Sequence, residues 1–304
     1  MTGKGKMEYT VKTEETGKYV REILRQSMGV SYTAMKSAKW NGRLWLNGES
    51  VHTDAQVQAG DTVRIEWGAE TPAYRPRRFD LPLTAAWEDE HLIAVVKPAP
   101  LASQSSRNHP DDSLENALYT AMGCPGDFVY RPVNRLDKGT SGLMVIAKTP
   151  YAQDRLQRQL HTPQFRRRYL AMTDGVPAEK TGVIDLPIAK APGATVKRII
   201  HPEGKPSRTQ YRVIRETGGH ALVLLELETG RTHQIRVHLN AIGCPVRGDF
   251  LYGMEQPEEF PGRFALHSAV LDILHPVTGE RILLISRPEW AGDLPDSVLL
   301  MDID

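Results

Sequence analysis

The sequence predicts an α+β protein in which a mixed, largely antiparallel β-sheet with inserted helices follows a small N-terminal module of two helices and short strands. Short strand-like runs dominate after residue 83, and helical patterns interrupt them without regular strand-helix-strand alternation. Of the 304 residues, 40% are hydrophobic and 25% are charged, which is ordinary for a globular protein. We expect a module at residues 12–70, a linker at 71–82 and a larger domain at 83–304.

Two helical patterns open the N-terminal module, at residues 18–26 and 32–39. Apolar residues recur on one face of the first, and Ser31 stands where it can cap the second. Lys36 and Lys39 are three residues apart on the second helix and therefore share one exposed face.

The rest of the module contains two hairpin-turn signals, Asn47-Gly48 and Gly60-Asp61. The whole pattern over residues 17–67 resembles the S-four-like RNA-binding domain. The resemblance implies that Lys36 and Lys39 contact RNA phosphates, and a merely solvated helix face is the alternative for these two lysines.

The larger domain opens with a strand at residues 91–96 and a helix capped by Ser113. An apolar run at residues 143–147 predicts a buried strand, and the pair Thr149-Pro150 marks the start of another helix. Further short strands are expected at residues 169–172, 182–187, 196–200, 207–214, 221–227, 264–266 and 282–285.

One more helix is expected after Thr232, which can serve as its cap. Apolar residues recur there at the helical period, namely Ile235, Leu239 and Ile242. The polar residues His233, Arg236 and Asn240 would then share the other face.

Several classes of protein are disfavoured by what the sequence lacks. Cys124 and Cys244 belong to no cysteine or histidine cluster, so neither a disulfide framework nor a zinc site is indicated. No apolar run approaches the roughly 18 residues of a membrane span, and the N-terminus has no apolar signal region. We expect a cytoplasmic protein, a monomer, with no cofactor, no metal and no membrane contact.

Positive charge gathers in the middle of the chain around one carboxylate, Asp137. Residues 131–170 hold nine Lys and Arg against two Asp, although the whole chain carries a net charge of only +1.

Other kinds of site are not indicated. His233 and His238 are separated by five residues, which places them on one face of neither a helix nor a strand and so disfavours a shared metal ion. Phosphate-binding glycine loops and a serine-hydrolase elbow are also absent from the sequence. A structural ion pair is the plain alternative for Asp137.

Five ordered motifs, NRLDKGTSGLMVIAK, RRYLAM, GKPSRTQYRV, TGRTHQIRVHLNAIGCPVRGD and RFALHS, resemble those of the RluA-type pseudouridine synthases across residues 85–288. The resemblance implies a pseudouridine synthase fold and a catalytic Asp137. It also implies that Tyr169 stacks on the base, that Arg236 pairs with the carboxylate, and that Arg135 enters the RNA helix where the base leaves. Phosphate contacts are expected from Arg155, Arg158 and the run Arg166–Arg168, for which a solvated face is the alternative.

Asn134 departs from the family pattern, which usually has histidine there, so any role of that position in holding the RNA backbone is in doubt. Ser207 and Ser268 occupy positions where alanine is common in that family.

An isomerisation exchanges no atoms or electrons, which agrees with the absence of a cofactor signature. Asp137 could attack the anomeric carbon or remove a proton from the neighbouring ribose carbon, and both routes need a charged carboxylate.

The expected substrate is large-subunit rRNA, with tRNA as the alternative. A catalytically inactive RNA-binding or ribosome-assembly factor of the same fold is the competing function. A glycosidase-like hydrolase is the third, but it normally needs a partnered acid carboxylate, and no motif supplies one.

Overall fold

The computed structural model describes residues 6–30, 32–40, 43–66, 72, 74–160, 162–194 and 196–303. The strands of the large sheet are β5 (Thr84–Glu88), β6 (Leu92–Lys97), β7 (Ser141–Ala147), β8 (Phe165–Asp174), β9 (Thr181–Asp185), β12 (Arg208–Thr217), β13 (His220–Leu227), β14 (Leu266–Leu274) and β15 (Arg281–Ile285). The helices inserted among them are α3 (Leu114–Ala121), α4 (Pro150–Gln159), α5 (Gln234–Ala241) and α6 (Asp296–Leu300), with a 3-10 turn η3 (Glu289–Ala291).

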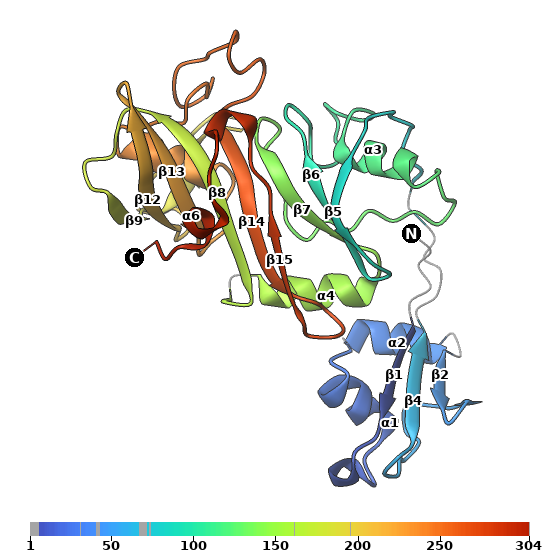
Figure 1. The fold of residues 1–304 in the computed structure, drawn as a ribbon. Helices are drawn as coiled ribbons and strands as arrows, with labels where there is room; N and C mark the ends of the chain where they lie inside the picture. Colours follow the sequence, from blue (N-terminus) through green and yellow to red (C-terminus); the bar gives the residue numbers. More distant parts are fainter. Residues whose placement is uncertain are drawn as a thin grey trace.

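The nine strands follow the order β5-β6-β7-β14-β8-β13-β12-β9, with β15 paired to β14 (Figure 1). Among the named strand pairs that the structure describes in this sheet, only β7 and β14 run parallel. The predicted α+β fold with a mixed, largely antiparallel sheet is therefore confirmed. A separate ribbon pairs β10 (Ile188–Lys190) with β11 (Arg198–Ile200).

Two of the predicted helix starts have the expected caps. Ser113 accepts a hydrogen bond from the backbone N–H of Asn116 at the start of α3. Thr149 accepts one from Ala152 at 3.1 Å, and Pro150 occupies the first turn of α4. These side chains satisfy N–H groups that have no partner inside the helix.

The middle of the large sheet is buried on both faces. Along β7, Met144 and Ile146 pack in a core with α3 and α5, while Leu143 and Val145 pack in a second core with α4. A strand covered on both faces needs apolar side chains at every position, which explains the unbroken apolar run of β7.

The N-terminal residues form a four-stranded sheet of order β1-β4-β2-β3 with a core of its own. Its elements are β1 (Lys6–Thr10), η1 (Thr13–Glu15), α1 (Val20–Glu22), a π-turn η2 (Ile23–Ser27), α2 (Tyr32–Trp40), β2 (Leu44–Leu46), β3 (Glu49–Ser50) and β4 (Thr62–Glu66). The first predicted helix is thus found as α1 continued by a π-turn. The proposed cap Ser31 lies outside the described residues.

Helix α4 lies between the large sheet and the N-terminal elements (Figure 1). Tyr151 of α4 packs into the N-terminal core, and its hydroxyl donates to the carbonyl of Met28 at 3.0 Å. One helix therefore contacts both cores. None of the helices in the described ranges is long and apolar enough to cross a membrane.

The parallel pairing of β7 with β14 depends on Gly142. It has φ +110°, and a Cβ at this position would lie 2.3 Å from the carbonyl oxygen of Ser268. Only glycine fits this close approach and this backbone conformation. The loop that carries Asp137 ends at this contact, so the glycine fixes where that loop leaves the sheet.

Some strands differ in length from their predictions. The structure extends the strand predicted at residues 264–266 to β14, which begins at Leu266 and ends at Leu274. It also extends the one predicted at 169–172 back to Phe165 through the arginine run. In β8 the arginines hide the strand pattern because two of them pair with Glu226 inside the fold, and in β14 the buried His267 and Ser268 interrupt it.

Candidate active site

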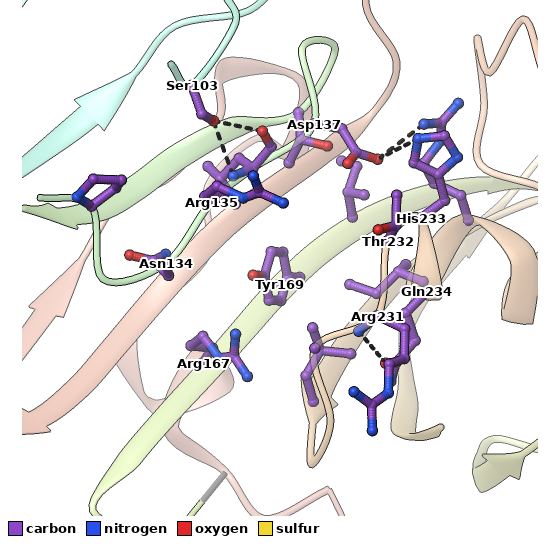
Figure 2. A pocket seen from close by; sticks show the side chains of 18 of the residues that line it. Ser103, Asn134, Arg135, Asp137, Arg167, Tyr169, Arg231, Thr232, His233 and Gln234 are labelled. Atoms are coloured by element: carbon purple, nitrogen blue, oxygen red, sulfur yellow. Dashed lines mark hydrogen bonds and ion pairs between the residues drawn. The ribbon is translucent and has the colours of Figure 1, made fainter. Parts of the chain in front are cut away.

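A cavity of about 520 Å³ opens on the large domain and collects the central residues predicted from the sequence. Asp137 comes from the loop before β7, Tyr169 from β8 and Arg236 from α5. Arg135 also lines the cavity and is exposed on the same loop as Asp137 (Figure 2). Segments far apart in the sequence therefore meet at one hollow.

Arg236 joins two carboxylates. Its Nε and Nη2 donate to Asp249 at 2.6 and 2.8 Å, and its Nη1 donates to Oδ2 of Asp137 at 2.9 Å. Asp249 is fully buried, whereas the side chain of Asp137 keeps 25% of its surface exposed to the cavity. Burial acts to lower the pKa of Arg236, but the two carboxylates outweigh it, so the pKa is raised and the guanidinium stays charged.

Aromatic rings surround this guanidinium. Its central carbon lies 4.3 Å from the ring centre of Phe264 and 5.0 Å from that of Tyr252. Ring faces attract a cation and restrict its movement. Together with the two-bond grip of Asp249, they hold Arg236 so that one N–H points at Asp137.

The loop of Asp137 is fastened on both sides of that residue. Ser103 donates to the carbonyl of Leu136 at 2.6 Å and accepts from its N–H at 3.1 Å. On the other side, the carbonyl of Lys138 accepts from the backbone N–H of Leu101 at 3.0 Å and from Nζ of Lys97 at 3.4 Å. These bonds hold the carboxylate in place before any substrate arrives.

Lys97 is itself fully buried and also donates to the carbonyl of Leu101 at 2.7 Å. Burial lowers the pKa of this ammonium group to about 7, with the charge of Asp137 acting in the opposite direction. The side chain thus ties the end of β6 to the loop of Asp137.

Asn134, the departure from the family pattern, bonds to β7. Its Oδ1 accepts from the N–H of Val145 at 2.8 Å, and its Nδ2 donates to the carbonyl of Leu143 at 3.4 Å. The side-chain amide of Asn134 therefore pairs with backbone groups of β7 as a neighbouring strand would. Asn134 is buried, at 4% exposure, and both of these hydrogen bonds go to protein backbone.

Tyr169 lies at the floor of the cavity and is 4% exposed. Burial raises the pKa of its phenol, which outweighs the opposing charge of Arg167, so the ring is neutral at neutral pH. Its position on a central strand of the sheet makes the ring a rigid platform.

His233 was placed on the helix by the sequence prediction, and this was wrong. The helix begins at Gln234, and His233 precedes it in the left-handed conformation with φ +60°. Thr232 is therefore not the cap. The left-handed turn sends the imidazole toward Asp137, so that Nε2 lies 3.8 Å from Oδ2 of the carboxylate.

The surroundings of His233 favour the tautomer with the proton on Nε2, because this nitrogen faces the carboxylate of Asp137. The hydroxyl of Tyr252 accepts from the backbone N–H of Arg198 at 2.8 Å, so its own proton is free to go to Nδ1 of His233, 2.8 Å away. Nδ1 then accepts, and Nε2 carries the proton. Burial lowers the pKa of His233, with Asp137 opposing, so this residue offers a neutral N–H to the cavity.

Two of the predicted RNA contacts, Arg166 and Arg168, do not line this cavity. Both pair with Glu226, at 2.8 and 2.7 Å, and Arg168 also donates to the carbonyls of Leu299 and Met301. Successive side chains of a strand point to opposite faces, so the residue between them, Arg167, lines the cavity instead.

The N-terminal lysines lie on α2. Lys36 is exposed there, as the helical pattern predicts. The side chain of Lys39 lies outside the described residues. Farther along, Arg155 on α4 lies against Gly29 of the N-terminal elements, and Arg158 pairs with Asp154 at 2.9 Å. Among the described residues, no group of His, Cys, Asp and Glu is arranged to hold a metal ion.

Sequence reasoning did not identify Asp249 and His233 as residues of the site, and it expected phosphate contacts from the whole run Arg166–Arg168 without singling out Arg167 as the one that lines the cavity. The motif that ends in GCPVRGD already contains Asp249, but a single acid in a loop gives no sign of which cation it meets. Arg167 could have been found from strand alternation, because it is two residues from Tyr169 and therefore shares its face.

Known structures share this fold. Human RNA Pseudouridylate Synthase Domain Containing 1 matches with a TM-score of 0.57 and 25% identity, over 68% of this chain and 84% of its own. Human RNA Pseudouridylate Synthase Domain Containing 4 matches with a TM-score of 0.55 and 24% identity, over 68% and 89%. The fold is that of the pseudouridine synthases.

Sequence comparison identifies the family. The model of the RNA pseudouridylate synthase family matches residues 91–241. An uncharacterized RNA pseudouridine synthase of Bacillus subtilis is 34% identical over 84% of this chain and 90% of its own length. The ribosomal large subunit pseudouridine synthase D of Nitrosomonas europaea is 36% identical over 84% and 76%. This chain belongs to the RNA pseudouridine synthases, isomerases that convert uridine into pseudouridine.

Proposed function

We propose that this enzyme acts on large-subunit rRNA and that Asp137 is its catalytic carboxylate. The observation that supports the role of Asp137 best is its ion pair with the buried Arg236, inside a cavity whose floor is Tyr169. The proposed substrate is supported by relatives named as large-subunit enzymes, one of which is 33% identical over 97% of this chain.

The target uridine must leave the RNA stack to reach Asp137, which costs a few kcal/mol. Stacking of the uracil on Tyr169 returns about 1 to 3 kcal/mol of this cost. The N1–C1′ bond then breaks with its electron pair staying on the uracil, which turns on the aromatic platform. C5 bonds to the same ribose carbon and loses its proton, while N1 takes up a proton. The pocket keeps the free uracil close, so no base is lost to solvent.

Asp137 starts the reaction in one of two ways. It attacks C1′ to form a covalent intermediate and leaves again when C5 bonds there, or it takes the proton from C2′ so that a glycal forms and returns that proton when C5 adds to C1′. A charged carboxylate is needed in both. A guanidinium about 4 Å away stabilises that charge by roughly 1 to 4 kcal/mol for effective dielectrics of about 80 to 20, and Arg236 supplies it.

The RNA itself is bound by surfaces around the cavity. Arg135, on the exposed loop beside Asp137, would fill the space left by the extruded base. Lys36 and Lys39 on the N-terminal module, which we take to be an S-four-like domain, would contact phosphates farther along the RNA. We place this activity in the cytoplasm.

Pseudouridine mapping of total RNA from cells with and without this protein tests the substrate. Sites in large-subunit rRNA that disappear without the protein support the proposal, while loss of sites only in tRNA would replace rRNA by tRNA. The Asp137→Asn variant should fold, bind RNA and make no pseudouridine. Turnover by that variant would exclude Asp137 as the catalytic group.

The same assay separates the competing functions. Pseudouridine has the mass of uridine, so a mass-neutral product indicates the isomerase and loss of a nucleobase indicates a hydrolase. RNA binding by the unaltered protein without any product would indicate an inactive binding or assembly factor.

A further inference from the structure

We propose that Arg167 is a binding site for a phosphodiester next to the extruded uridine. The inference rests on the proposed function, because the anion belongs to its RNA substrate. It assigns a ligand to a side chain that lines the cavity and that neither the ion pair of Asp137 nor the aromatic platform requires.

The free donors of Arg167 are the first observation. Its Nε and Nη2 are both buried, and neither finds a hydrogen-bond partner within the described part of the chain. The residue as a whole is 93% buried, since its exposure is 7%. Within the described residues no carboxylate pairs with its guanidinium, whose central carbon lies 5.9 Å from the ring centre of Phe165. Both neighbours in sequence, Arg166 and Arg168, share Glu226.

These two nitrogens form one edge of the guanidinium. The same edge of Arg166 binds Glu226 with two parallel bonds of 2.8 and 3.0 Å, and that of Arg236 binds Asp249 in the same way. In both cases the partner is a planar pair of oxygens. A phosphate offers an equivalent pair, and arginine binds it by the same fork.

An unpaired buried cation is expensive, because its lost hydration is not replaced. A bound ligand that accepts the free hydrogen bonds is one explanation for a buried donor without a partner. Rotation of outer side-chain bonds is common when partners bind. A turn of the guanidinium into the cavity would bring its fork to a phosphate without backbone movement.

The position of Arg167 selects the phosphate. It lies on β8 two residues before Tyr169, so the two side chains share one face of the strand about 7 Å apart and point to the same cavity (Figure 2). A uracil stacked on Tyr169 has its ribose at Asp137. The phosphodiesters that can reach Arg167 are then those on the 5′ or 3′ side of the same nucleotide.

The first test measures RNA affinity against salt for the Arg167→Met variant, with Asp137→Asn in the background so that no turnover occurs. Loss of one phosphate contact should weaken binding about tenfold and lower the slope of log K against log salt by about 1. Arg281→Met is the matched control, because Arg281 pairs with Asp272 outside the cavity. Its slope should equal that of the background protein.

Arg167→Lys provides the second variant, since it keeps the charge and loses the fork. It should keep the salt slope and bind less tightly than arginine. An Arg167→Met protein that binds more weakly with an unchanged slope would indicate contact with a neutral base atom and would overturn the proposal. An equal loss of slope in Arg281→Met would overturn it as well.

A second test replaces the phosphate on either side of the target uridine by a neutral methylphosphonate. One of the two replacements should weaken RNA binding about tenfold for the protein that retains Arg167, and should not change RNA binding by the Arg167→Met variant. If both replacements cost the same in the two proteins, Arg167 contacts neither phosphate.

Folding is a separate readout. Without RNA, Arg167→Met should be at least as stable to heat as the unaltered protein, because it removes a buried charge that no carboxylate within the described residues balances. A large loss of thermal stability would show that Arg167 is structural. If the unaltered enzyme forms no pseudouridine, the proposed function is wrong. If it forms pseudouridine but substitution of Arg167 changes neither RNA affinity nor the salt slope, only this inference is wrong.

Discussion

Asp137 and Asp249 lie on different sides of one guanidinium, that of Arg236, and differ in exposure. The buried Asp249 takes the Nε and Nη2 edge, and the cavity-facing Asp137 takes Nη1. One carboxylate therefore fixes the arginine, and the arginine in turn orients the other carboxylate. Because Asp249 fixes Arg236 and Arg236 binds Asp137, the carboxylate of Asp137 is held in one position before substrate binds, although its side chain is 25% exposed.

We expect Asp249→Asn to lower the rate of pseudouridine formation by about 100-fold, because displacement of a positioned group by roughly 1 Å costs about this much. RNA affinity should change far less, since Asp249 does not reach the cavity surface. Single-turnover assays with excess enzyme measure the chemical step. Asp174→Asn is the control, because Asp174 pairs with Arg247 away from the cavity. Equal rates for the two variants would contradict the role of Asp249.

His233 should act through its Nε2–H. Glutamine can offer an N–H at a similar reach, whereas methionine cannot, and both replacements carry the same backbone strain at φ +60°. We expect His233→Gln to retain most activity and His233→Met to lose about 10- to 100-fold, as for a lost hydrogen bond in a buried site. Steady-state assays of both variants measure this.

Tyr252 offers a check on that tautomer. Tyr252→Phe removes the hydroxyl that donates to His233 and should slow the enzyme. The same change in a His233→Met background should have little further effect, because the two residues act as a unit. Additive losses in the double variant would show that Tyr252 acts independently of His233.

Asn134→Ala should destabilise the fold by about 1 to 3 kcal/mol, because it leaves the buried N–H of Val145 without its partner. Denaturant unfolding measures this change. Asn108, which is exposed, is the control, and its replacement by alanine should stay within about 0.5 kcal/mol. An Asn134→Ala protein as stable as the control would contradict the clamp on β7.

His267 should make the fold sensitive to acid. Burial lowers its pKa to about 4, with Lys97 adding to the effect and the bond to Ser286 opposing it. Between pH 6.5 and 4 the unfolded chain therefore binds more protons than the folded one, and stability falls as the pH falls.

The measurement compares unfolding free energies at pH 7 and 4.5 for the unaltered protein and for His267→Gln, which can keep bonds to Ser141 and Ser286. The unaltered protein should lose about 2 to 3 kcal/mol more than the variant. Equal losses would mean that other groups cause the acid effect.

The sequence predicted elements best where local chemistry decides them. Ser113 and Thr149 begin their helices as expected, because a cap needs only a side-chain oxygen within a few residues of free N–H groups. The same reasoning predicted Thr232 as a cap, and that prediction was wrong. The helix starts after a left-handed His233, whose conformation depends on the hydrogen bond to Tyr252 and on packing in the cavity.

Strand β14 shows a different limit. Its apolar run, residues 269–274, is interrupted by Asp272 and preceded by His267 and Ser268, which the fold buries, so the pattern alone did not show the full strand. The same holds for the arginines of β8. Their strand conformation becomes evident only once Glu226 lies beside them.

By itself the sequence determined the fold class, the family and the presence of Asp137, Tyr169 and Arg236, because these depend on residue types and their order along the chain. Only the tertiary structure decided that Asp249 holds Arg236, that His233 turns its Nε2–H toward Asp137, and that Arg167 rather than its neighbours lines the cavity. The physical reason is that hydrogen-bond partners and buried charges are chosen by distance in space, and residues about 100 positions apart become neighbours only after the sheet has closed around them.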